Sequence, residues 1–173
     1  LYKRGWRGIN IDLDQKSIEE FNKIREKDYN VQSLVSSKSN KEKDIFYYHS
    51  RSAINTVSEE LIKYRNTDKN KIQVLKQKTE TLENIIERSP YKNKKIDLLS
   101  IDIENHEYEA LKNFNFSKYK IQVIVIEIHD LKQDKLEIYN QSLDFVLNSN
   151  IYKLLDKNGY KLINWVNSDF VFI

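Results

Sequence analysis

The chain of 173 residues contains no cysteine and no methionine. Without cysteine, disulfides, cysteine-ligated zinc and thiol nucleophiles are excluded within it. Without methionine, Leu1 is not a natural start, so we expect an N-terminal segment to be missing. No apolar run approaches the roughly 18 residues that span a bilayer, and no signal peptide is visible. These absences favour a cytoplasmic protein.

Glycine is also scarce, because the chain has only Gly5, Gly8 and Gly159. Neither GxGxxG nor GxxxxGK[ST] occurs, so the sequence shows no phosphate-binding loop of either kind. The 29 basic residues are nearly matched by 26 acidic ones, and they are scattered, which argues against a nucleic-acid partner. The three histidines have no HExxH spacing, and we expect no metal site.

Apolar runs typical of strands alternate with amphipathic segments typical of helices. Strands are expected over 8–12, 29–35, 43–49, 71–76, 96–103, 121–128, 160–166 and 170–173. Helices are expected over 14–27, 59–64, 79–87, 106–114, 136–147 and 151–157, with Thr79 capping the third. This order predicts one α/β domain over 1–173. We expect three αβα layers, a mostly parallel sheet buried on both faces, and an antiparallel C-terminal hairpin.

Polar side chains end the strands with the strongest burial signals. In doubly wound sheets ligands bind at the carboxyl ends of the strands. The candidate residues there are Asp12, Ser33, Leu34, Asp102, Glu104, Glu127 and His129. Asp12 has a specific role available, since a carboxylate in this place can accept hydrogen bonds from a ribose diol, either of a nicotinamide cofactor or of S-adenosylmethionine. The first strand of such folds is central and precedes a glycine-rich turn, and we expect both in the missing N-terminal segment.

Several segments resemble the FkbM family of methyltransferases. LYKRGWRGINIDLD at 1–14 resembles the family's GW-G-I-x-I-(E/D)-P-(N/D), with Asp12 at the acidic position. The strongest match is TETLENIIE at 79–87 followed by IDLLSIDIENHEYEAL at 96–111. The segments 121–127 and 159–173 are similar to a later strand and to the closing hairpin. The family's Glu-Gly pair is Glu104-Asn105 here, and asparagine tolerates the left-handed backbone better than most residues.

The resemblance implies a Rossmann-like class I fold and methyl transfer from S-adenosylmethionine, usually to oxygen on a sugar, glycan or small natural product. It implies that Asp12 binds the ribose and that Ser33 and Leu34 lie near the adenine. Asp102 would contact the methionine end or act as base. Glu104 and His106 would shape the acceptor side, with Glu127 and His129 as further candidates.

Simpler interpretations stay open for these residues. Glu104 and Glu107 could only place negative charge at the start of a helix, and His106 could be only a residue of its first turn. At the level of the whole chain, a nicotinamide-dependent oxidoreductase or epimerase would use Asp12 in the same way. That class predicts a GxGxxG loop in the missing N-terminal segment and a Tyr-x-x-x-Lys pair. A third possibility is a non-catalytic methyltransferase-fold module that docks a partner.

Overall fold

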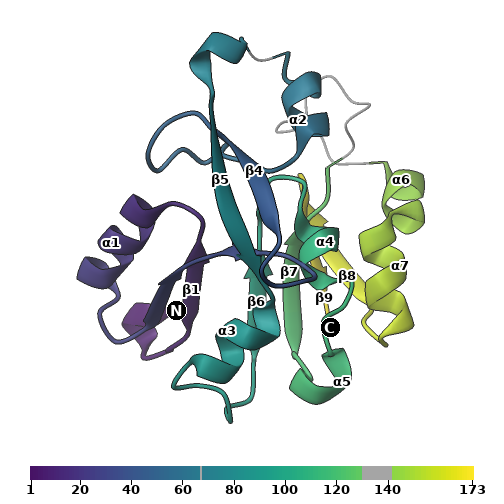
Figure 1. Ribbon diagram of the computed structural model, residues 1–173. Helices are drawn as coiled ribbons and strands as arrows, with labels where there is room; N and C mark the ends of the chain where they lie inside the picture. Colours follow the sequence, from purple (N-terminus) through teal and green to yellow (C-terminus); the bar gives the residue numbers. More distant parts are fainter. Residues whose placement is uncertain (67, 130–141) are drawn as a thin grey trace.

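Strands and helices alternate along most of the chain in the computed structural model, which describes residues 1–66, 68–129 and 142–173 (Figure 1). The strands are β1 Ile9–Asp12, β2 Tyr29–Gln32, β3 Leu34–Val35, β4 Glu42–Tyr47, β5 Gln73–Glu80, β6 Leu98–Ile101, β7 Val123–Glu127, β8 Leu162–Val166 and β9 Asp169–Phe172. The helices are α1 Gln15–Ile24, α2 Glu59–Tyr64, α3 Leu82–Arg88, α4 Glu107–Leu111, α5 Phe116–Tyr119, α6 Leu143–Asn148 and α7 Asn150–Lys157, with 3-10 turns η1 Tyr2–Arg4 and η2 Lys69–Lys71.

The described strands form three small sheets, which corrects the expectation of one mostly parallel sheet. β1 pairs with β2 in parallel, and β5 lies between β3 and the antiparallel β4. The third sheet has the order β6-β7-β9-β8, in which β6 and β7 are parallel and the closing hairpin is antiparallel, as predicted. A cavity, described below, lies between β1 of the first sheet and β6 of the third.

Local contacts explain where several elements begin and end. The strand predicted over 29–35 is interrupted at Ser33. The residues before Ser33 form β2, and those after it form β3, which pairs with β5. The predicted cap at Thr79 is wrong, because Thr79 lies within β5 and its hydroxyl donates to the carbonyl of Lys38 at 2.6 Å. Thr81 caps α3 instead, accepting from the amide of Asn84. The helix predicted over 136–147 lies partly outside the described residues.

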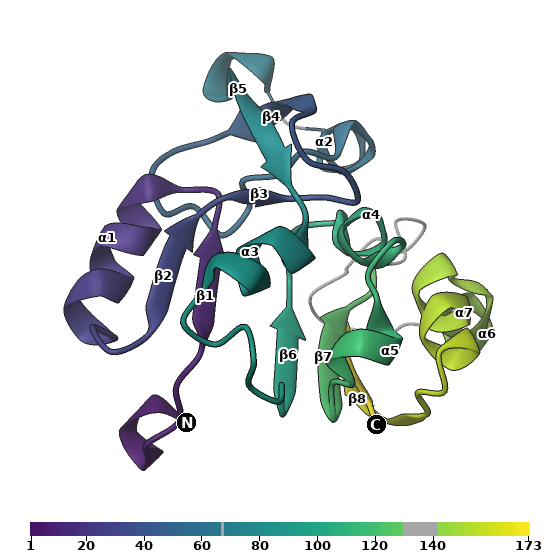
Figure 2. The same cartoon turned by 60° about the horizontal axis from the view of Figure 1, so that its bottom comes forward.

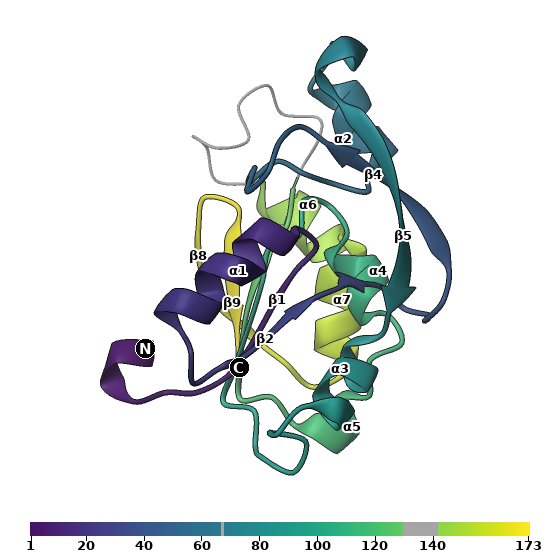
Figure 3. The same cartoon turned by 60° about the vertical axis from the view of Figure 1, so that its left-hand side comes forward.

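A hydrophobic core lies between the third sheet and helices α3, α4, α5 and α7. Figure 3 shows these helices on one side of the strands and α1 on the other. Among the described helices, none is long and apolar enough to cross a membrane. The side chains with no solvent exposure in this core are Leu111, Ile124, Ile126, Leu155, Phe170 and Phe172. Their burial holds β7 at the centre of its sheet and fixes the strand ends that carry the candidate site.

Candidate functional site

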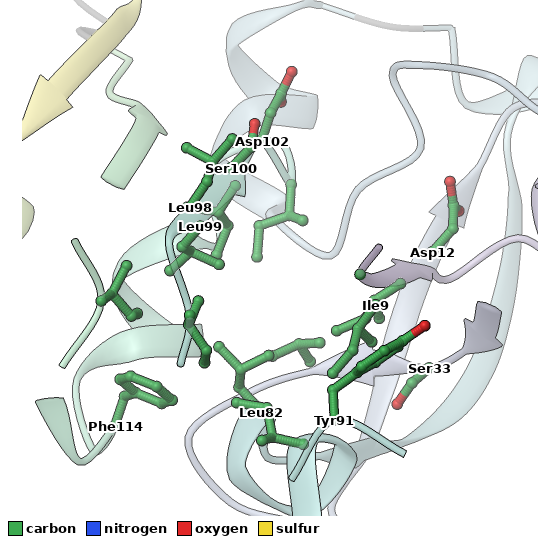
Figure 4. Close-up of a pocket in the computed structure, with 18 of the residues that line it drawn as sticks. Ile9, Asp12, Ser33, Leu82, Tyr91, Leu98, Leu99, Ser100, Asp102 and Phe114 are labelled. Atoms are coloured by element: carbon green, nitrogen blue, oxygen red, sulfur yellow. The ribbon is translucent and has the colours of Figure 1, made fainter. Parts of the chain in front are cut away.

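Carboxylates from two different sheets face one cavity. Asp12 ends β1, and Asp102 directly follows β6. Both line a cavity of about 300 Å³ that lies between these strands, which we call the β1–β6 cavity (Figure 4). Figure 4 shows the two carboxylates on opposite sides of it, at the same end of the strands. The sequence predicted that these side chains share one rim, and the structure brings them there.

The residues predicted to bind the nucleoside lie beside Asp12. The carboxylate of Asp12 accepts a hydrogen bond from the amide of Asp14 at 2.8 Å, and burial raises its pKa. The amide of Ser33 donates to the carbonyl of Asp12 at 2.9 Å, which holds the end of β1 against the next segment. Ser33 and Leu34 are buried and also line the cavity. These three residues therefore form one wall.

Asp102, on the opposite wall, belongs to a group of three carboxyl groups. Oxygen atoms of Asp102, Glu107 and Glu127 lie within 4.8 Å of one another, and we call this group the acidic cluster. Desolvation raises the pKa of Glu107 to about 7. Desolvation and then the charge of Glu127 raise the pKa of Asp102 to about 7, although its side chain is exposed to solvent. Near neutral pH the cluster therefore holds protons that isolated carboxylates would have lost.

Glu107 is the member of the acidic cluster that the sequence did not identify as a site residue. The sequence suggested only that Glu107 places negative charge at the start of a helix. It is 3% exposed, and its Oε1 accepts a hydrogen bond from the amide of Ile103 at 2.8 Å. A signal for this burial was present, because Ala110 and Leu111 follow at helical spacing on the same face. Both of these residues are buried.

Glu127 also forms a buried pair with His129. Nε2 of His129 lies 2.7 Å from Oε1 of Glu127, and the two side chains are 7% and 12% exposed. The hydroxyl of Ser168 donates to the same Oε1 at 3.1 Å. Desolvation lowers the pKa of His129, but the hydrogen bond and charge of Glu127 outweigh it, so the pKa is raised overall. The pair therefore holds a proton more readily than an isolated histidine does.

The turn at Glu104 and Asn105 has a left-handed backbone and is held by residues on both sides of α2. The φ angles of the two residues are 59° and 66°, so Asn105 takes the conformation predicted for it. Nη2 of Arg65 lies 2.6 Å from Oε2 of Glu104, and the hydroxyl of Thr56 donates to the Glu104 carbonyl at 2.7 Å. The side-chain amide of Asn105 donates to the Ser58 hydroxyl at 3.0 Å. Nothing in the sequence pointed to Arg65.

His106 is buried at the start of α4 and lines the cavity. Its Nε2 lies 3.3 Å from the hydroxyl of Ser36. Desolvation lowers the pKa of His106 to about 4, so the ring is neutral at neutral pH. A pKa so far below neutral makes the ring a weak general base there.

The acidic cluster is also the group of described residues whose spacing suits a cation. Carboxylate oxygens are the ligands that Mg²⁺ and Ca²⁺ prefer. A bound cation would have to displace the protons of Asp102 and Glu107 and compete with His129 for Glu127. The absence of a metal site stays a prediction.

An α/β fold with carboxylates at the carboxyl ends of parallel strands is typical of enzymes that bind nucleosides. The family model described as the methyltransferase FkbM domain matches residues 1–162. The chain therefore belongs to the FkbM methyltransferase family. This membership does not favour the oxidoreductase or the non-catalytic module. No curated protein and no solved structure matches the chain significantly.

Proposed function

We propose that this methyltransferase domain uses S-adenosylmethionine to methylate an oxygen atom of a sugar, a glycan or a small natural product, and that no nucleic acid serves as acceptor. The observation that carries the proposal is the placement of Asp12 and Asp102 on two walls of one cavity. Two walls with carboxylates can bind the two polar ends of one elongated cofactor.

The wall of Asp12 fits the nucleoside. A carboxylate offers about four acceptor positions, and the bond from the amide of Asp14 uses one oxygen of Asp12. The carboxylate can therefore accept further hydrogen bonds from a ribose diol. Leu34 offers an apolar surface to the flat face of a base, and Ser33 lies next to it.

The opposite wall fits the cationic end of the cofactor. When bound, S-adenosylmethionine supplies a methyl group activated by a positively charged sulfur. Within the acidic cluster, desolvation raises the pKa of Glu127, but its hydrogen bond to His129 and the charge of His129 outweigh it and lower the pKa overall. Glu127 therefore stays ionised at neutral pH, and its charge favours a cationic group beside Asp102. The family membership and this charge support the same choice of cofactor.

The remaining residues suit the acceptor. We assign the Glu127–His129 pair to removal of the acceptor hydroxyl proton, since a histidine paired with a carboxylate is a common general base. Glu104, fixed by Arg65, orients the acceptor. His106 remains neutral and forms part of the wall. Holding an acceptor in line with a methyl group is itself a large part of catalysis.

Calorimetric titration of the chain with S-adenosylhomocysteine tests the cofactor. Loss of a hydrogen bond to a charged group costs about 1.5–3 kcal/mol, so Asp12→Asn should weaken binding about tenfold or more. Asp44→Asn, at an exposed carboxylate of β4, is the matched control and should change nothing. Equal affinity of Asp12→Asn and the unmodified chain would overturn the assignment. Transfer of a radiolabelled methyl group to a panel of sugars, lost in Glu127→Gln, tests the reaction.

A further inference from the structure

The β1–β6 cavity lies between two strands that belong to different sheets. Within the described part of the chain, β1 pairs with β2 alone and β6 pairs with β7 alone. At the amino ends of these strands, the hydroxyl of Tyr91 donates to the carbonyl of Lys27 at 2.9 Å and links the two walls. Figure 2 shows the arrows of β1 and β6 pointing the same way, toward β4 and α2. The spacing of the carboxyl ends, which carry Asp12 and Asp102, therefore needs contacts of its own.

One segment of the chain contacts both walls at this carboxyl end. It comprises residues 48–58, which join β4 to α2, and we call it the β4–α2 segment. Thr56 exchanges two backbone hydrogen bonds with Phe46 of β4, at 2.8 and 3.2 Å, so the segment lies against that strand. Val57 lines the cavity. The β4–α2 segment therefore reaches the same cavity that the two walls enclose.

The first anchor of this segment is Asp14, on the wall of Asp12. The amide of Arg51 donates to Oδ2 of Asp14 at 2.6 Å, and the hydroxyl of Tyr47 donates to the same oxygen at 3.0 Å. Oδ1 of Asp14 caps α1 by accepting from the amide of Lys16 at 2.7 Å. The amide of Asp14 itself donates to the carboxylate of Asp12 at 2.8 Å. Asp14 therefore joins the segment to the residue that we assign to the ribose.

The second anchor is Thr56, on the wall of Asp102. Thr56 has no solvent exposure. Its hydroxyl donates to the carbonyl of Glu104 at 2.7 Å and accepts from the amide of Ser58 at 2.9 Å. The side-chain amide of Asn105 donates to the hydroxyl of Ser58 at 3.0 Å. These bonds hold the turn that directly follows Asp102 and its neighbour, so the segment extends from one wall to the other.

We propose that Asp14 and Thr56 are positioning residues, which anchor the β4–α2 segment to the two walls and thereby set the distance between them. The proposal rests on the proposed function, in which one elongated cofactor contacts both walls. Affinity for such a ligand falls with the fraction of molecules that have the right spacing. A ligand that contacts one wall alone is insensitive to that spacing.

Calorimetry with two ligands separates the spacing of the walls from other effects. S-adenosylhomocysteine should contact both walls, whereas adenosine should contact the wall of Asp12 alone. Thr56→Val keeps the shape of the side chain but removes the hydroxyl. Asp14→Asn keeps an N-cap residue for α1 but offers one acceptor oxygen in place of two. If either change leaves the right spacing in about one tenth of the molecules, affinity for S-adenosylhomocysteine falls about tenfold, and affinity for adenosine changes less than about twofold.

The two anchors should not act independently, because each releases the same segment. The double variant Asp14→Asn/Thr56→Val should therefore bind S-adenosylhomocysteine about as weakly as either single variant. Independent effects would multiply to about a hundredfold loss. Thr56→Ser keeps the hydroxyl and should restore the affinity. If Thr56→Val fails to fold, Asp14→Asn tests the other anchor.

Ser149→Ala is the matched control for loss of a hydrogen bond. The side chain of Ser149 caps α7 by accepting from the amide of Tyr152, and it contacts neither anchor. Loss of this cap should lower stability by an amount typical of helix caps. The affinities for both ligands should stay unchanged.

Spin labels measure the spacing without any ligand. Because the chain has no cysteine, Ile24→Cys in α1 and Lys153→Cys in α7 place one label beside the first sheet and one beside the third. Both sites are exposed. The distance distribution from pulsed electron paramagnetic resonance should broaden when Thr56→Val is added, and it should not broaden with Ser149→Ala.

Unchanged affinity of both anchor variants for S-adenosylhomocysteine, or an equal loss of affinity for adenosine, would overturn the proposal. An unchanged distance distribution in Thr56→Val would do the same. If the unmodified chain fails to bind S-adenosylhomocysteine, the proposed function is wrong. The distance distributions then still decide whether the β4–α2 segment sets the spacing of the walls, so the two failures are distinguishable.

Discussion

The buried neutral ring of His106 should make the stability of the protein depend on pH. Its pKa falls from 6.5 to about 4 on folding, because the folded chain removes the ring from water. Between these two values the unfolded chain binds a proton that the folded chain does not. The stability associated with the neutral ring is therefore fully present above about pH 6.5 and is lost as the pH falls toward 4. A difference of about 2.5 pKa units corresponds to about 3 kcal/mol.

Urea unfolding followed by circular dichroism between pH 4 and pH 7.5 measures this loss. We compare the unmodified chain with His106→Gln, which keeps a polar group near Ser36 but does not titrate. From pH 7 to pH 4, the unmodified chain should lose about 3 kcal/mol more of its unfolding free energy than His106→Gln loses. His49→Gln, at an exposed histidine, is the control and should keep the original profile. Parallel profiles for His106→Gln and the unmodified chain would refute the reasoning.

Two further predictions concern the acidic cluster. Folding raises the pKa of Glu107 from 4.5 to about 7, so the folded state loses stability as the pH rises through this range. Glu107→Gln should therefore gain up to about 3 kcal/mol relative to the unmodified chain between pH 5 and pH 8, measured by urea unfolding; a constant difference would count against burial of a protonated carboxyl. Removal of divalent cations with EDTA should leave the affinity for S-adenosylhomocysteine unchanged in calorimetry, because the cluster holds protons near neutrality; a fall that added Mg²⁺ reverses would show a metal site instead.

Much of the secondary structure could be predicted from local patterns. The run at 121–128 is almost wholly β-branched, and β7 lies within it. Helix α2 has the predicted bounds, since Ser58 caps it and Leu61 and Ile62 are buried on one face. Pairing between strands could not be predicted as well. β5 continues to Glu80 because Thr79 and Glu80 pair with β3, a contact between distant parts of the chain.

The candidate site divides in the same way. Asp12, Asp102 and Glu127 could be found because each ends or follows an apolar strand, and strand ends meet at one rim. Arg65 could not be found, since its partner Glu104 lies 39 residues further along the chain and only folding brings them together. The half-exposed edges of β1 and β6 were likewise invisible in the sequence, which indicated strands buried on both faces.

A crystal structure of the chain with S-adenosylhomocysteine tests the central claim most directly. We predict a single nucleoside in the β1–β6 cavity, with its ribose diol hydrogen-bonded to Asp12 and its sulfur toward Asp102. A nucleoside bound elsewhere on the molecule, or a ribose that makes no contact with Asp12, would contradict the account.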